Sequence, residues 1–159
     1  MNKFSKIFES ESESKFKLGL DIHGVVDAMP ETFAFLTKSI IESGGEVHII
    51  TGGSWNDELE FQLKNLNIKW THSFSVYDHL IENNTSIIGE IQFEDGTIQK
   101  KFEGGAWDKV KGKYCADHKI SLHLDDTLIY NDFFTTPFAR IWTHNGKAKS
   151  HKKDLRHIP

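Results

Sequence analysis

The chain has 159 residues, of which 38% are hydrophobic and 26% charged, with three prolines and a formal net charge of -4. This length suits one domain with a single core, and the composition excludes disordered and fibrous proteins. The slight negative charge argues against nucleic acid or an anionic membrane as a standing partner. The single cysteine, Cys115, cannot form an internal disulfide, and no stretch approaches the roughly 20 apolar residues of a membrane span. We therefore expect a cytoplasmic protein, with no membrane association and no sign of an obligate protein partner.

Strand and helix patterns alternate along most of the chain. Residues 9–14 are polar and low in complexity, which predicts a flexible lead-in over residues 1–16. Residues 17–146 are predicted to form the folded domain, and residues 147–159 form a basic tail. A helix is expected to begin at Pro30 and to be closed by Gly44-Gly45. The other predicted helices cover 54–66, with Ser54 or Asn56 as the cap, 76–81 and 106–118; the predicted strands cover 17–22, 47–50, 68–73, 120–125 and 138–143.

A change of pattern interrupts this alternation. Residues 87–102 alternate apolar and polar side chains around the turn Glu94-Asp95-Gly96, which predicts a β-hairpin. The remaining elements predict an α/β fold, a Rossmann-like three-layer α/β/α sandwich with a mostly parallel sheet and a small hairpin insertion.

Three polar residues end predicted strands. Asp21, Thr51 and Asp125 each follow an apolar run, and Asp126 comes next in the chain. Ligands of parallel sheets bind at the carboxyl ends of the strands, so we expect these side chains to share one edge. Several carboxylates at one edge repel one another unless a cation intervenes, and oxygen ligands suit Mg²⁺. The alternative is that Asp125 and Asp126 only cap a turn before Thr127.

Two further segments add candidate anion-binding groups. Thr51-Gly52-Gly53 lies between a strand and a helix, where backbone N–H groups can face an anion. Lys109, Lys111 and Lys113 lie on the predicted 106–118 helix. Three lysines on one helix usually form a solvated face, but one of them reaching a phosphate would neutralise its charge.

In this order, the motifs resemble those of the haloacid dehalogenase-like phosphatase superfamily. The first motif reads Leu20-Asp21-Ile22-His23-Gly24-Val25-Val26, and the second reads Ile49-Ile50-Thr51-Gly52. The fourth motif is matched by Leu124-Asp125-Asp126, and the lysine of the third is best matched by Lys111, with Lys109 as second choice.

The resemblance implies a Mg²⁺-dependent phosphomonoester hydrolase. Asp21 would attack phosphorus and form an aspartyl-phosphate, with Thr51, Gly52 and Gly53 at the phosphate and Lys111 offsetting charge. Asp21, the main-chain carbonyl of His23, and one or both of Asp125 and Asp126 would hold the metal. The substrate would be a phosphorylated small molecule, a nucleotide or a nucleic-acid end. Little material is inserted between the motifs, so a nearly capless site is expected, with the hairpin and Trp107 near its entrance.

Position 23 departs from the family pattern. The phosphatases of this superfamily have an aspartate acid/base there, and this chain has His23. Three interpretations stay open: His23 acts as the acid/base, the enzyme is slow, or the domain binds phosphate or metal without turnover. A nucleotidase or phosphotransferase that acts on a small metabolite is a further alternative. The other histidines show no pair at metal-ligand spacing, and we expect His48 and His123 to be surface or core polar positions.

Overall fold

The computed structural model describes residues 15–93, 96 and 98–142, and it contains a five-stranded sheet and a separate two-stranded hairpin. The sheet has the order β3-β2-β1-β6-β7, and every pairing in it is parallel. Its strands are β1 (Lys17–Leu20), β2 (Glu46–Thr51), β3 (His72–Ser75), β6 (Leu122–Asp125) and β7 (Phe138–Arg140). The chain moves from β1 to β2 and β3 on one side and later to β6 and β7 on the other. The reversal between β1 and β6 is the switch point at which ligands of such sheets bind.

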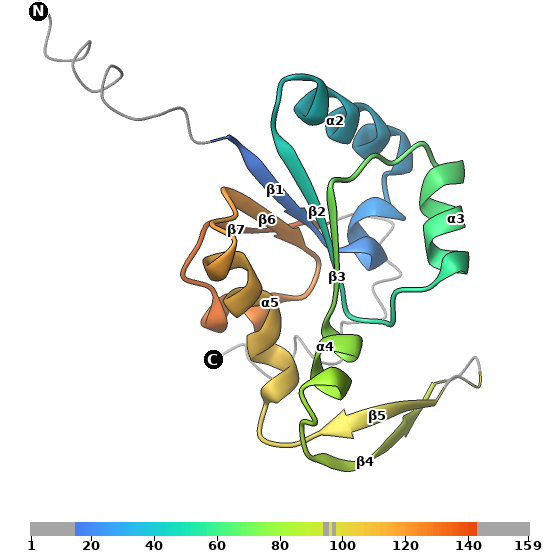
Figure 1. The fold of residues 1–159 in the computed structure, drawn as a ribbon, viewed down its shortest axis with the longest axis vertical. Coiled ribbons are helices and arrows are strands. Elements are labelled where there is room, and N and C mark those ends of the chain that lie inside the picture. Colours follow the sequence, from blue (N-terminus) through green and yellow to red (C-terminus); the bar gives the residue numbers. More distant parts are fainter. Residues whose placement is uncertain (1–14, 94–95, 97, 143–159) are drawn as a thin grey trace, which may run out of the picture.

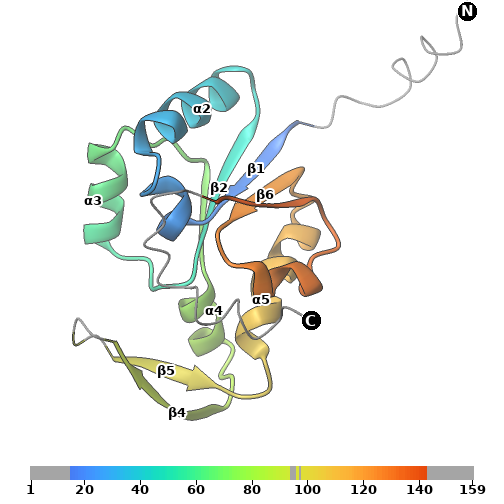
Figure 2. The same cartoon turned by 180° about the vertical axis from the view of Figure 1, so that it is seen from behind.

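Helices cover both faces of the sheet (Figures 1 and 2). Helices α2 (Pro30–Glu42) and α3 (Asp57–Asn65) bury Phe33 and Leu63 against β1 and β2. Helix α5 (Ala106–Asp117) buries Tyr114 and Cys115 against Ile50 on the opposite face. Alternate residues of a strand point to opposite faces, so Ile49 and Ile50 enter different clusters. The predicted α/β/α sandwich is confirmed.

Short elements complete the fold. Helix α4 (Val76–Glu82) follows β3, an irregular helical turn η1 (Ile22–Val26) follows β1, and a 3-10 helix η2 (Leu128–Phe133) follows β6. The predicted hairpin is present as the antiparallel pair β4 (Ile87–Gln92) and β5 (Ile98–Phe102). It extends from the end of the molecule faced by the carboxyl ends of β2 and β3 (Figure 1).

Two strands begin later than predicted, and one motif explains both. The N–H groups of Asn67 and Ile68 bond to the carbonyls of Lys64 and Leu63, with Asn67 at a φ of 58°. This is the Schellman ending of α3, in which an apolar residue past the helix packs back on it. Ile68 therefore terminates a helix, and β3 starts at His72 rather than at 68.

The same bonding occurs after α5. Lys119, at a φ of 54°, donates to Ala116, and Ile120 donates to Cys115, which delays β6 to Leu122. The predictions for residues 1–14, for the tail at 147–159 and for the hairpin residues 94, 95 and 97 lie outside the described residues. Over the described ranges, no helix has the length and apolarity needed to cross a bilayer.

Candidate active site

Strand register brings Asp21 and Asp125 together. Leu20 of β1 pairs with Leu124 of β6, and the N–H of Asp21 donates to the Leu124 carbonyl at 3.0 Å. Both aspartates therefore leave neighbouring strands at the switch point, and both are buried, Asp125 completely. One carboxylate oxygen each from Asp21, Asp125 and Asp126 lies within 4.8 Å of the others. Three of the four predicted metal-site residues thus share one place.

Lys111 joins this carboxylate group from α5. Its Nζ lies 2.6 Å from Asp125 Oδ2 and 3.0 Å from Asp21 Oδ1, and its side chain is only 2% exposed. The ammonium also lies 4.8 Å from the centre of the Tyr130 ring. Lys109, on the same helix, is exposed. Of the two lysines left open by the sequence, the structure therefore places Lys111 at the carboxylates.

The two buried aspartates, Asp21 and Asp125, differ in their hydrogen-bond partners and in the direction of their pKa shifts. Asp125 also contacts His123 Nε2 at 3.2 Å and accepts the Thr127 N–H at 2.9 Å. Burial would raise the pKa of Asp125, but the charge of Lys111 and the hydrogen bond from His123 outweigh it and lower the pKa to about 2. At Asp21 burial dominates over the opposing Lys111 and raises the pKa to about 7. The negative charge therefore resides first on Asp125, and Asp21 is the carboxylate that a further cation would help to ionise.

Asp126 is half-buried beside the η1 turn. Its Oδ1 accepts a hydrogen bond from the Thr127 hydroxyl at 3.0 Å, and burial raises its pKa. Gly24 has a φ of 78°, and a Cβ there would come within 2.3 Å of Asp126 Oδ2. Only glycine allows both this conformation and this approach. The bonds from Thr127 to both aspartates show that the predicted turn capping also occurs.

His23 lies at the outer side of the site. Its side chain is 79% exposed, and its Nδ1 lies 3.3 Å from Asp27 Oδ2. Asp27 also accepts the Gly24 N–H at 2.7 Å, so this carboxylate fixes both the turn and the ring. The hydrogen bond that the His23 ring donates to the Asp27 carboxylate raises the pKa of His23. His23 is thus oriented by a carboxylate, as acid/base histidines often are.

The predicted phosphate-binding segment, Thr51-Gly52-Gly53, begins at the last residue of β2, at the same edge of the sheet. Leu20 pairs with Ile49, which puts Thr51 one residue past the level of Asp21. Thr51 is buried, Gly52 is half-buried and Gly53 is exposed. A Cβ on Gly52 would lie 3.2 Å from the Trp107 ring, so the predicted entrance residue packs on this segment. Trp107 Nε1 in turn donates to the Tyr130 hydroxyl at 3.1 Å.

Two residues at the site were not predicted to belong there. His123 is confirmed as a core polar position, and its contact with Asp125 follows from their i, i+2 spacing on β6. The i, i+2 spacing of His123 and Asp125 can be seen in the sequence. Tyr130 comes from η2, and no pattern in the sequence predicts its position over Lys111.

The donor set fits a hard divalent cation. Mg²⁺ prefers oxygen ligands and is commonly held by one or two carboxylates together with water. Asp21, Asp125 and Asp126 supply three carboxylates, and Lys111 supplies one positive charge, which leaves two formal negative charges when all three are ionised. A divalent ion would balance them.

The fold and this site define an α/β protein with a carboxylate–lysine group at the switch point of a parallel sheet. Comparisons with protein-family models, with curated proteins and with solved structures found no match. The resemblance to the haloacid dehalogenase-like superfamily therefore depends on the motifs and stays a prediction.

Proposed function

We propose that this protein is a Mg²⁺-dependent phosphomonoester hydrolase of the haloacid dehalogenase-like type, with Asp21 as the nucleophile. The observation that carries the proposal is the convergence of Asp21, Asp125 and Asp126 around the buried Lys111. A buried group of charges at a sheet switch point costs folding energy, and such groups are commonly retained for catalysis or binding.

Each residue of the candidate site has a role in the proposed reaction. A carboxylate oxygen of Asp21 attacks phosphorus, the ester P–O bond breaks, and the leaving oxygen takes a proton from His23. Water then gives a proton back to His23 and attacks phosphorus, which breaks the bond to Asp21 and releases phosphate. Thr51 and the Gly52 N–H would hold phosphate oxygens while Lys111 offsets their charge. Bound Mg²⁺, held by Asp21, Asp125, Asp126 and the His23 carbonyl, would reduce repulsion between phosphate and carboxylate.

The exposure of His23 supports an open site. A side chain that is 79% exposed can reach the leaving group of a bulky ester without a closing cap. The substrate is therefore a molecule with a terminal phosphate: a small metabolite, a nucleotide or a nucleic-acid end. We expect the hairpin and Trp107 to contact the part of the substrate beyond the phosphate.

The test is phosphate release from an aryl phosphate, with and without Mg²⁺. We expect activity that EDTA removes and Mg²⁺ restores, and that falls to background in Asp21→Asn. Asp57→Asn, an exposed aspartate of α3, is the matched control and should keep full activity. Hydroxylamine should trap the acyl-phosphate as a hydroxamate at Asp21. Activity that persists in Asp21→Asn would disprove the nucleophile.

Two outcomes would favour the alternatives. Mg²⁺ or phosphate binding without turnover would identify a binding module. Turnover restricted to one compound, in a screen of nucleotides, sugar phosphates and phosphorylated oligonucleotides, would identify a nucleotidase or a phosphotransferase. The same screen would show which phosphate esters the open site accepts.

A further inference from the structure

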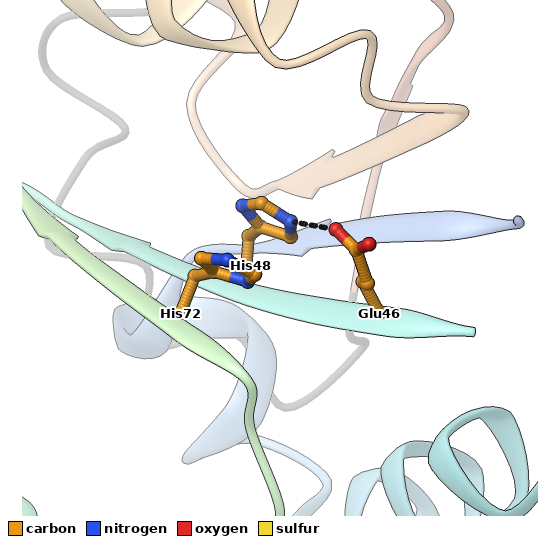
Figure 3. Close-up of side chains that lie close together, drawn as sticks. All are labelled: Glu46, His48 and His72. Atoms are coloured by element: carbon orange, nitrogen blue, oxygen red, sulfur yellow. Dashed lines mark hydrogen bonds and ion pairs between the residues drawn. The ribbon is translucent and has the colours of Figure 1, made fainter. Parts of the chain in front are cut away.

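A second group of potential metal ligands lies at the opposite edge of the sheet. Glu46 is the first residue of β2, His48 follows on the same face, and His72 is the first residue of β3. Parallel pairing puts His48 beside His72, and their rings stack with centroids 4.2 Å apart (Figure 3). We call Glu46, His48 and His72 the β2–β3 cluster. On β2, Glu46 precedes Thr51 by five residues and His48 precedes it by three, which are distances of about 16 Å and 10 Å along the strand.

We propose that the β2–β3 cluster binds a divalent transition-metal ion such as Zn²⁺. The ligands would be His48 Nε2, a Glu46 carboxylate oxygen and a ring nitrogen of His72, with solvent completing the coordination. Two imidazoles and a carboxylate form a common three-ligand set for zinc, whereas Mg²⁺ prefers oxygen ligands alone. This proposal does not depend on the phosphatase proposal.

The distances agree with this ligand set. His48 Nε2 lies 3.2 Å from Glu46 Oε2, as the dashed line in Figure 3 shows. Bonds of about 2.1 Å to a tetrahedral zinc hold two ligand atoms about 3.4 Å apart. This pair therefore already has the required separation. One ligand atom from each of the three residues lies within 4.8 Å of the others, so His72 needs only a small movement.

The movement required of His72 is a rotation of its ring. The two imidazole planes are within 12° of parallel, so their nitrogen lone pairs do not yet converge. His48 is buried and fixed, whereas His72 is exposed and can turn. The exposed side of the cluster also provides an entry path for the ion.

Hydroxyl groups support both histidines from outside. Tyr114 Oη lies 2.9 Å from His48 Nδ1, and Thr71 Oγ1 lies 2.9 Å from His72 Nδ1. Such outer contacts fix the tautomer and orientation of metal-binding histidines. The Tyr114 hydroxyl can donate or accept, so it can accept from His48 Nδ1 when Nε2 binds a metal. Lys17 opposes binding because its Nζ lies 3.2 Å from Glu46 Oε2, and this partly exposed side chain would have to move away.

The experiment is a titration with ZnCl₂ of the full chain from which EDTA has removed metal and has itself been removed. Isothermal calorimetry measures the binding, and thermal unfolding measures the change in stability. The buffer contains millimolar Mg²⁺, which competes with Zn²⁺ for the carboxylates of Asp21, Asp125 and Asp126, because Mg²⁺ prefers oxygen ligands. We expect saturable binding of one zinc ion per chain. We also expect the unfolding temperature to rise, because binding stabilises the native state. His72→Ala should weaken the zinc Kd by at least about tenfold, since changes even in outer partners cost 10- to 100-fold.

Two variants and one control complete the test. Glu46→Gln should weaken zinc binding as well, and both substitutions affect residues with solvent access, so folding is preserved. His79→Gln, at a histidine of α4 outside the cluster, should bind as the parent does. Absence of saturable binding, or binding unchanged in His72→Ala and Glu46→Gln, would overturn the proposal. Binding that is lost in Asp21→Asn would also overturn it, because the ion would then belong to the other site.

Cobalt gives a separate readout of coordination. Co²⁺ in a four-coordinate site with nitrogen ligands absorbs strongly in the visible region, whereas hydrated Co²⁺ absorbs weakly. We expect the strong absorption in the parent and its loss in His72→Ala. A spectrum of hydrated Co²⁺ in the parent would contradict the proposed ligand set.

Discussion

Replacing Lys111 with methionine should destabilise the protein more than any other single change to a lysine of α5. Lys111 is the partner of two buried carboxylates, at 2.6 Å from Asp125 and 3.0 Å from Asp21. Methionine keeps most of the length of the side chain and removes the charge, so the electrostatic loss is separated from the packing loss.

The magnitude follows from the burial of all three groups. Breaking a buried ion pair by removing one partner costs about 3–5 kcal/mol, since the remaining charge is left without compensation. For a domain of this size, where each kcal/mol shifts the unfolding temperature by about 2–4 °C, the expected decrease is about 6–20 °C. The carboxylates share this ammonium, so Lys111→Met combined with Asp125→Asn should cost less than the sum of the single changes.

Urea unfolding followed by circular dichroism measures the change in the free energy of unfolding. Lys109→Met is the matched control, because Lys109 is exposed on the same helix and should cost less than about 0.5 kcal/mol. If Lys111→Met unfolds within that margin of the parent, Lys111 does not hold the carboxylates together, and the electrostatic reasoning is wrong.

Three further predictions concern other parts of the fold. Gly112→Ala should lower stability by about 1–3 kcal/mol in thermal unfolding, because a Cβ would lie 2.2 Å from the Phe133 carbonyl oxygen; a gain from better helix propensity would contradict this. Asn56→Ala should cost about 1 kcal/mol in urea unfolding, since the Asn56 side chain caps α3 by accepting the Leu59 N–H at 2.8 Å, and an unchanged midpoint would refute the cap. Cys115 is fully buried, and burial raises the pKa of its thiol to about 12, so a disulfide reagent at pH 8 should label it only after unfolding.

Much of the candidate site could be predicted because strand ends of a parallel sheet share an edge. Asp21, Thr51 and Asp125 each end an apolar run, and the sheet order then determines which of them are neighbours. The lysine was harder to identify. Lys109 and Lys111 differ by two residues on a helix and so point to different sides, and only the packing of α5 decides which is buried.

The β2–β3 cluster could not be predicted from spacing. Glu46 and His48 are two residues apart, but His72 comes 24 residues after His48, and only the pairing of β2 with β3 makes them neighbours. The late starts of β3 and β6 have another cause. Ile68 and Ile120 are apolar like strand residues, but each is the buried apolar residue of a Schellman motif that ends the preceding helix.

The hairpin is attached to the domain through two closely spaced ends. The Glu103 N–H donates to the Ser86 carbonyl at 3.1 Å, so the chain leaves and re-enters at nearly the same point. Among the hairpin residues that the structure describes, Phe102 alone is buried, and it packs with Val76 and Val110. Residues 87–101 can therefore be shortened, lengthened or exchanged for another loop while the sheet and its helices stay in place, which makes this segment the natural position for grafting new selectivity onto the scaffold.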